Sequence, residues 1–148
     1  MAPTARPADP GDLLGVLRLH QRDPGLDPSG VTDRQRAAWD RMMAAEGLTV
    51  YVACDGGEVV GVVSLQTMPN LGYDCRPSFL EAMVVAEGHR RRGVGRLLVE
   101  RALDDAAAGC HKVQLLTHKR HATDGAHDFY RAVGFSAEAE GFRLYLDP

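Results

Sequence analysis

The stretch from residue 79 to residue 117 constrains the fold more than any other part of the chain. An apolar run at 79–86 is followed by the segment HRRRGVGR at 89–96, and apolar residues then recur at helical spacing as far as Ala106. A second strand-like run comes at 112–117. A strand, a helix and a strand of these lengths predict a βαβ unit, in which the two strands run parallel with a right-handed crossover.

The segments outside this unit predict a mixed sheet with helices. A short strand is expected at 4–6, an amphipathic helix from Asp9 to His20, and a second helix that begins with a capping box at Thr32 and Gln35 and ends at Gly47. Asp55-Gly56-Gly57 separates two valine-rich runs, 48–54 and 58–66, which predicts a hairpin. Two further elements are expected, a helix over 123–133 and one or two short antiparallel strands within 135–146.

Composition narrows the class of protein. The 148 residues, 45% hydrophobic and 25% charged, predict one soluble α/β domain over 1–148, with a mixed, mostly antiparallel sheet and helices on both faces. A formal net charge of −3, with the densest basic cluster confined to one short segment, argues against nucleic-acid binding. Neither a membrane span of about 18 apolar residues nor a signal peptide is evident. The three cysteines are odd in number and form no CxxC pair, which favours the cytoplasm.

The segment HRRRGVGR predicts an anion site at the start of a helix. Each cation at a helix N-terminus costs roughly 0.3 to 1 kcal/mol unless something offsets it, and here Arg90, Arg91, Arg92 and Arg96 surround Gly93-Val94-Gly95. A Gly-x-Gly turn lets backbone N–H groups approach a phosphate closely. A dinucleotide fingerprint would need glycine at Leu98, and a Walker motif would need lysine at Val94. The alternative is a solvated basic turn.

Two motifs in this order resemble one enzyme family. Arg90-x-x-Gly93-x-Gly95 resembles the Q/R-x-x-G-x-G/A signature of the GNAT superfamily of N-acetyltransferases. Downstream, the residues from Ala126 to Phe135 resemble the family's A-x-x-F-Y-x-x-x-G-F block. The resemblance covers essentially the whole chain. It implies a sheet splayed between two parallel strands, acetyl-coenzyme A as cosubstrate, its pyrophosphate bound at residues 90–96, no metal, and direct acetyl transfer to a primary amine in a ternary complex.

The resemblance also implies roles for individual residues. Backbone groups of Met83, Val84 and Val85 would pair with the pantetheine arm, and Tyr130 would be the general acid. Tyr130 also lies on an i, i+3, i+4, i+7 stripe, so a plain core tyrosine is the alternative. Many members carry asparagine at the position of Thr123, where its amide contacts the cofactor arm; threonine offers a hydroxyl or a helix cap instead.

Glu81 is a charged residue in an otherwise apolar segment, FLEAMVV. Strand alternation predicts that it shares a face with Phe79, Met83 and Val85. There it could accept the proton of the amine or bind the ammonium form. The competing interpretation is an edge position paired with Arg76. The loop before this strand is a candidate acceptor wall, in which Tyr73, Asp74 and Arg76 could contact the substrate.

The sequence does not identify the acceptor, and it leaves other functions open. The acceptor could be a small-molecule amine or a peptide amine. A catalytically silent coenzyme A binding or sensing domain would keep the glycine turn without depending on Tyr130, and a mononucleotide site is a third possibility. His118, His121 and His127 lack the spacing of a zinc site, and the segment His118-Lys119-Arg120-His121 predicts a polar loop. An edge strand near the C-terminus makes a homodimer reasonable.

Overall fold

The computed structural model describes residues 2–71, 76–109 and 112–146. Tyr73 and Asp74, two of the three residues expected to contact the acceptor, lie outside the described residues. The chain divides into two compact units, here called unit 1 (Met1–Leu115) and unit 2 (Leu116–Pro148). No helix among the described residues is both long and apolar enough to cross a membrane.

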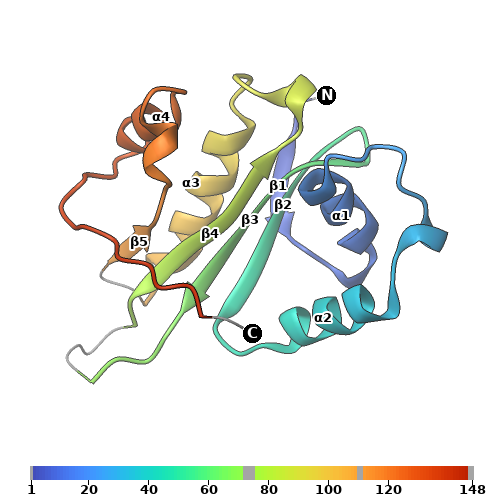
Figure 1. Cartoon of the computed structure of the whole chain (residues 1–148), viewed down its shortest axis with the longest axis horizontal. Helices are drawn as coiled ribbons and strands as arrows, with labels where there is room; N and C mark the ends of the chain where they lie inside the picture. The colour runs from blue at the N-terminus through green and yellow to red at the C-terminus, as the bar shows by residue number, and fades with distance from the viewer. Residues whose placement is uncertain (1, 72–75, 110–111, 147–148) are drawn as a thin grey trace. The chain divides into compact units, whose positions relative to one another are not determined.

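Unit 1 is built on a five-stranded sheet (Figure 1). The strands lie side by side in chain order: β1 (Thr4–Pro7), β2 (Leu48–Asp55), β3 (Glu58–Thr67), β4 (Ser78–Val85) and β5 (Val113–Leu115). The first three pairings are antiparallel, and β4 pairs with β5 in parallel. The predicted mixed, mostly antiparallel sheet and its βαβ unit are therefore confirmed.

The hairpin between β2 and β3 forms where the glycines predict it. Asp55 pairs with Glu58 across a turn whose two residues, Gly56 and Gly57, have φ values of 58° and 87°. These are left-handed conformations that glycine adopts without the steric cost a Cβ would bring. The turn therefore fixes the register of the valine-rich strands.

Helices cover both faces of this sheet (Figure 1). On one face, α1 (Leu13–Gln21) and α2 (Asp33–Ala44) bury Val16, Leu19 and Trp39 against Val50, Val52 and Val62 of β2 and β3. On the other face, α3 (Val94–Ala106) packs so closely that a Cβ on Gly61 would lie 2.9 Å from atoms of Leu98 and Val94. We call these the α1/α2 face and the α3 face.

The N-terminal helices differ from expectation only at their ends. The capping box of α2 is present, with Thr32 and Gln35 bonded reciprocally, but the helix ends at Ala44 and Gly47 belongs to the following turn. A short 3₁₀ helix, η1 (Pro10–Asp12), precedes α1. Leu19 is the buried residue in the last turn of α1.

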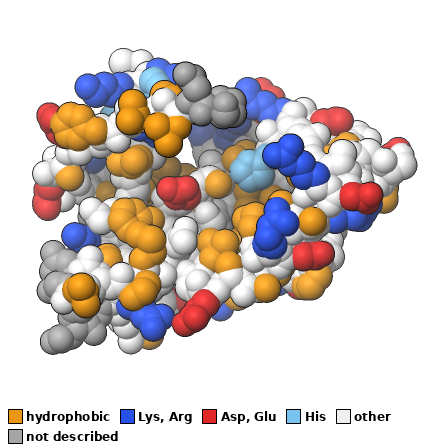
Figure 2. Space-filling view, turned by 60° about the horizontal axis from the view of Figure 1, so that its bottom comes forward, with side chains coloured by type: hydrophobic (Ala, Val, Ile, Leu, Met, Phe, Trp, Pro, Cys, Tyr) orange, Lys and Arg blue, Asp and Glu red, His pale blue; other side chains and the backbone are white. Residues whose placement is uncertain are grey.

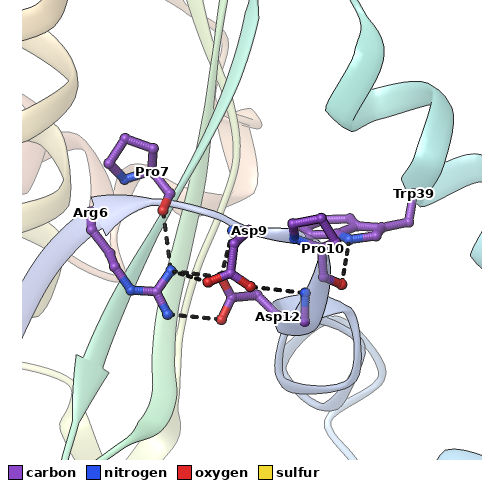
Figure 3. Close-up of polar contacts among 7 residues, drawn as sticks. Arg6, Pro7, Asp9, Pro10, Asp12 and Trp39 are labelled. Atoms are coloured by element: carbon purple, nitrogen blue, oxygen red, sulfur yellow. Dashed lines mark hydrogen bonds and ion pairs between the residues drawn. The ribbon is translucent and has the colours of Figure 1, made fainter.

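A polar cluster anchors the N-terminal strand to these helices (Figure 3). The Arg6 guanidinium donates to both carboxylate oxygens of Asp12, at 2.7 and 3.0 Å, and the Asp9 N–H donates to the same carboxylate. The Trp39 indole N–H donates to the Pro10 carbonyl at 3.2 Å. Burial of the Asp12 carboxyl acts to raise its pKa, but the hydrogen bonds and the charge of Arg6 outweigh this, so the pKa lies below its usual value.

Unit 2 contains two short helical elements, η4 (Lys119–Ala122) and α4 (Ala126–Ala132). The helix predicted over 123–133 thus begins later, at Ala126. The predicted C-terminal strand is wrong, because no strand forms among the described residues after Leu115. Phe142, Leu144 and Leu146 do alternate in sequence, but their side chains are exposed. Alternation alone does not make a strand without a partner edge, and the basis for the predicted homodimer is lost.

Candidate active site

The turn that opens α3 leaves backbone donors available. The short 3₁₀ helix η3 (Glu87–His89) leads from β4 into it, and Gly93 occupies the N-cap position of α3 with φ 83° and no side-chain cap. The Leu97 N–H donates to the Gly93 carbonyl at 2.9 Å, so the N–H groups of Val94 and Gly95 precede the first bond of the helix. Nothing lies within 4 Å of a Cβ placed on Gly93. An anion can therefore approach this backbone closely.

The four arginines around this turn are all exposed. Arg90 donates to the Val85 carbonyl at 3.2 Å, Arg92 to the Gly88 carbonyl at 3.4 Å, and Arg96 lies 3.3 Å from a Glu100 oxygen. Arg91 has a left-handed φ of 58°, which is uncommon for a residue with a side chain. Val94 is different, because its side chain is buried against Gly61, and only its backbone is available at the turn.

The neighbouring strand β4 extends beyond its parallel partner. β5 pairs only with Ser78, Phe79 and Leu80, so residues 81–85 of β4 keep β3 as their strand partner on one side and have none among the described residues on the other. Within this overhang the strand bulges: the register shifts between Val62 and Ser64 of β3, and Ala82 has φ 53°. The backbone of residues 83–85 therefore offers an edge to which an extended ligand could bind.

The bulge corrects the prediction for Glu81. Directly paired residues point to the same face of a sheet, and Glu81 pairs with Ser64, as Val84 pairs with Val62 on the α1/α2 face. Val85 pairs with Gly61 on the α3 face, so the prediction that Glu81 and Val85 share a face is wrong. The extra residue in the bulge shifts the alternation. Although Glu81 stands in an apolar segment of the sequence, its side chain is exposed.

Arg76 does not accompany Glu81. Its guanidinium lies 4.0 Å from Glu46, and it lines a cavity of about 230 Å³ together with Thr49, Tyr51 and Asp105. This cavity lies beside the C-terminal end of α3, on the face opposite Glu81. The structure therefore does not support the predicted pairing of Arg76 with Glu81.

In unit 2, Tyr130 lies on α4 among aromatic rings. Its ring centroid is 5.2 Å from that of Phe129 and 6.1 Å from that of Phe135. Burial raises the pKa of the Tyr130 phenol above its ordinary value, which keeps the hydroxyl protonated at neutral pH. Among the described residues we find no hydrogen-bond partner for this hydroxyl. The phenol thus has both the protonation state and the available proton that a general acid needs.

Thr123 does not cap α4, contrary to one prediction. Gly125 is the N-cap residue, with φ 92°, and the Asp124 carboxylate accepts from the Ala126 N–H at 3.1 Å. Thr123 is exposed at the end of η4. Its hydroxyl is left to interact with solvent or a ligand.

The segment predicted as a polar loop, 118–121, is polar but forms most of the 3₁₀ helix η4, and His127 lies on α4. The His118 ring accepts from the Arg120 N–H at 3.1 Å, and the His121 ring bonds to Asp124, which holds the pKa of that carboxyl below its usual range. His127 Nε2 is buried without a hydrogen-bond partner among the described residues. In the part of the chain that the structure describes, no group of three His, Cys, Asp or Glu side chains is placed to hold a metal ion.

One contact at the turn was not foreseen from the sequence. His89 Nε2 lies 3.1 Å from Asp55 Oδ2, so the loop before α3 is joined to the tip of the β2–β3 hairpin. The two residues are 34 positions apart, and no spacing rule connects a turn aspartate with a histidine in a basic segment.

The surface charges of the molecule are mixed. On the face drawn in Figure 2, basic, acidic and hydrophobic side chains of the described residues are interspersed.

Comparisons with known proteins place these features in a family. Residues 13–135 match the model of the acetyltransferase (GNAT) family. A candidate acetyltransferase from Agrobacterium tumefaciens has 36% sequence identity and a TM-score of 0.87, with 97% of this chain and 99% of that one covered. A transcriptional regulator from Bacillus halodurans has 28% identity and a TM-score of 0.85, covering 98% and 100%.

The same fold occurs in more distant proteins. Glucosamine-6-phosphate N-acetyltransferase from Arabidopsis thaliana has 20% identity and a TM-score of 0.79, with 99% of this chain and 100% of that one covered. No curated protein matches the sequence. The family match includes the glycine turn, the overhanging part of β4 and Tyr130. The chain belongs to the GNAT family of acetyltransferases.

Proposed function

We propose that the protein transfers the acetyl group of acetyl-coenzyme A to a primary amine, and that the whole chain works as one acetyltransferase domain. The observation that carries this proposal is the turn at Gly93, where the first N–H groups of α3 and four arginines lie next to the part of β4 that has no parallel partner among the described residues. The family match extends from residue 13 to residue 135 and so includes parts of both units.

The glycine turn and β4 supply complementary parts of the cosubstrate site. In this proposal the N–H groups of Val94 and Gly95 bind the diphosphate, because a helix N-terminus stabilises negative charge. The guanidiniums of the four arginines at 90, 91, 92 and 96 add charge-assisted hydrogen bonds. The edge at Met83–Val85 pairs with the amide groups of the pantetheine arm. Thr123 offers a hydroxyl to the same arm.

The chemical step is a direct transfer. The neutral amine attacks the thioester carbonyl carbon, the carbonyl oxygen becomes an oxyanion held by a backbone N–H of β4, and the C–S bond breaks. Tyr130, whose phenol is protonated at neutral pH, gives its proton to the departing thiolate. The exposed Glu81 carboxylate accepts the proton of the amine, directly or through water. No redox or metal-dependent step is required to balance this reaction.

The acceptor is a primary amine, from either a small molecule or a peptide. Glu81 would attract its ammonium form to the α1/α2 face beside β4, where a carboxylate is accessible. A panel of amines, including aminosugars, polyamines and short peptides with lysine or a free N-terminus, distinguishes the two classes when coenzyme A release is followed with a thiol reagent.

A coenzyme A sensing domain is the second candidate. It is favoured by one specific observation, the 28% identity with a protein described as a transcriptional regulator. Such a domain would bind acetyl-coenzyme A at the same turn and transfer nothing. Binding without turnover on the amine panel would select it, whereas thiol release that depends on both the amine and the enzyme selects the acetyltransferase.

A thermal-shift comparison tests the cosubstrate itself. Acetyl-coenzyme A should raise the melting temperature of the purified chain more than ATP does at equal concentration, because a ligand that binds only the folded state stabilises it by mass action. A larger shift with ATP would favour a mononucleotide site and contradict the proposal.

A further inference from the structure

Among the described residues, a single side-chain contact joins the loop that leads into the glycine turn to a distant element of the fold. Within 87–93, Arg92 bonds to Gly88 of the same loop and Arg90 bonds to the end of β4. His89 alone, among the described residues of the loop, reaches a distant element through its side chain, with Nε2 at 3.1 Å from Asp55 Oδ2. We call this contact the Asp55–His89 tether.

Both partners of the tether are positioned by their own elements. Asp55 is the last residue of β2 and pairs with Glu58 across the two-glycine turn, so its backbone is fixed by the hairpin. His89 ends η3, and its N–H donates to the Ala86 carbonyl at 2.9 Å. The two side chains are only 27% and 23% exposed, which shields the pair from competition by water. The paired end of β2 therefore holds the loop from a distant element of the fold.

The loop needs such a support because of the residues directly after His89. Three consecutive arginines repel one another, and Arg91 adopts a left-handed φ of 58° that a residue with a side chain populates only at a cost. Other sheet contacts of the turn come before or after it: the Ala86 N–H bonds to Val60, and Val94 packs against Gly61. The tether lies between these two attachments and brings a carboxylate next to the basic segment.

We propose that Asp55 and His89 are positioning residues for the cosubstrate: their tether holds the loop in the conformation that binds the diphosphate of acetyl-coenzyme A. This inference rests on the proposed function, and neither residue touches the cosubstrate. Without the tether, the binding of acetyl-coenzyme A must also order the loop, and that ordering weakens the affinity. Once the cosubstrate is bound, the chemical step proceeds as in the parent protein.

Calorimetric titration with acetyl-coenzyme A tests the tether. Asp55→Ala and His89→Ala should each weaken binding by roughly 3- to 30-fold, which spans the upper range for an ordinary hydrogen bond and the lower range for one to a charged group. The double variant should bind no more weakly than the single ones, because both remove the same interaction. His89→Gln, which keeps a donor, should recover part of the loss. In steady state, the KM for acetyl-coenzyme A should rise while kcat and the KM for the amine change less than about twofold.

Controls separate positioning from general stability. Arg101→Gln removes another ion pair of unit 1, the contact of Arg101 with Asp105 at 3.5 Å, and should leave the affinity for acetyl-coenzyme A unchanged. Melting temperatures of all variants are measured alongside. Affinities of both alanine variants within about twofold of the parent, or losses that add in the double variant, would overturn the inference. If the parent protein itself does not bind acetyl-coenzyme A, the proposed function fails instead.

Discussion

At the scale of single residues, Tyr130 and Glu81 differ in how far the sequence predicts their setting. A motif identifies Tyr130, and its half-buried ring, protonated phenol and hydroxyl without a partner among the described residues agree with the proposed acid. The face on which Glu81 lies cannot be obtained in the same way, because it depends on a bulge at Ala82. An alanine with positive φ carries no sequence signal, since only tertiary packing selects that conformation.

Tyr130→Phe is the residue-scale test of catalysis. Removing the phenolic proton donor should lower kcat by about 10²-fold or more, the usual contribution of general acid catalysis. The affinity for acetyl-coenzyme A and the melting temperature should change little, because the ring and its contacts with Phe129 and Phe135 remain. The rate of coenzyme A release measures kcat, and calorimetric titration measures the affinity for acetyl-coenzyme A. Unaltered kcat would remove Tyr130 from the mechanism.

Asp12→Asn tests the N-terminal cluster. The variant loses the charge that holds Arg6. Its free energy of unfolding, measured by urea titration at pH 7, should therefore be lower than that of the parent by about 1 to 3 kcal/mol. Because the folded-state pKa of Asp12 lies below its usual value of 3.8, its contribution is complete above that value and is lost as the pH falls through the lower folded pKa. The difference between parent and variant should therefore shrink in strong acid. Asp40→Asn, on the exposed side of α2, serves as the control and should show neither effect.

At the scale of elements, local signals predict most of unit 1. The two-glycine turn, the capping box at Thr32 and the βαβ order each depend on a few adjacent residues, and all three are confirmed. Elements that form only by pairing with distant parts of the chain are harder to predict from the sequence. The alternation of residues 142–146 predicts a strand, yet no strand forms there, because a strand is stabilised by the edge it joins and the sequence does not encode that edge locally.

Gly61→Ala tests how closely α3 must approach the sheet. The new Cβ would lie 2.9 Å from side-chain atoms of Val94 and Leu98, so α3 or its side chains must shift. We expect a loss of about 1 to 3 kcal/mol in the free energy of unfolding, as for other overpacked cores. Since Val94 is the first residue of α3, the affinity for acetyl-coenzyme A should fall as well. Gly88→Ala, where nothing lies within 4 Å of the added Cβ, is the matched control. Equal stability of both variants would contradict the close packing.

At the scale of the whole molecule, the family match connects features that each unit carries separately. Unit 1 contains the glycine turn, the overhang of β4 and the Asp55–His89 tether, and unit 2 contains Tyr130. The match over residues 13–135 includes all of them. The identity of the acceptor does not follow from the residues expected to contact it. Tyr73 and Asp74 lie outside the described part of the chain, and Arg76 lies beside a cavity on the α3 face.

The central claim is that the turn at Gly93 binds the diphosphate of acetyl-coenzyme A, and calorimetric titration of the purified chain tests it most directly. The account predicts saturable binding at one site, weakened in the double variant Arg90→Gln, Arg92→Gln and by rising salt, because guanidinium–phosphate contacts are screened. Absence of binding at millimolar acetyl-coenzyme A, or affinity indifferent to both arginines and to salt, would contradict it.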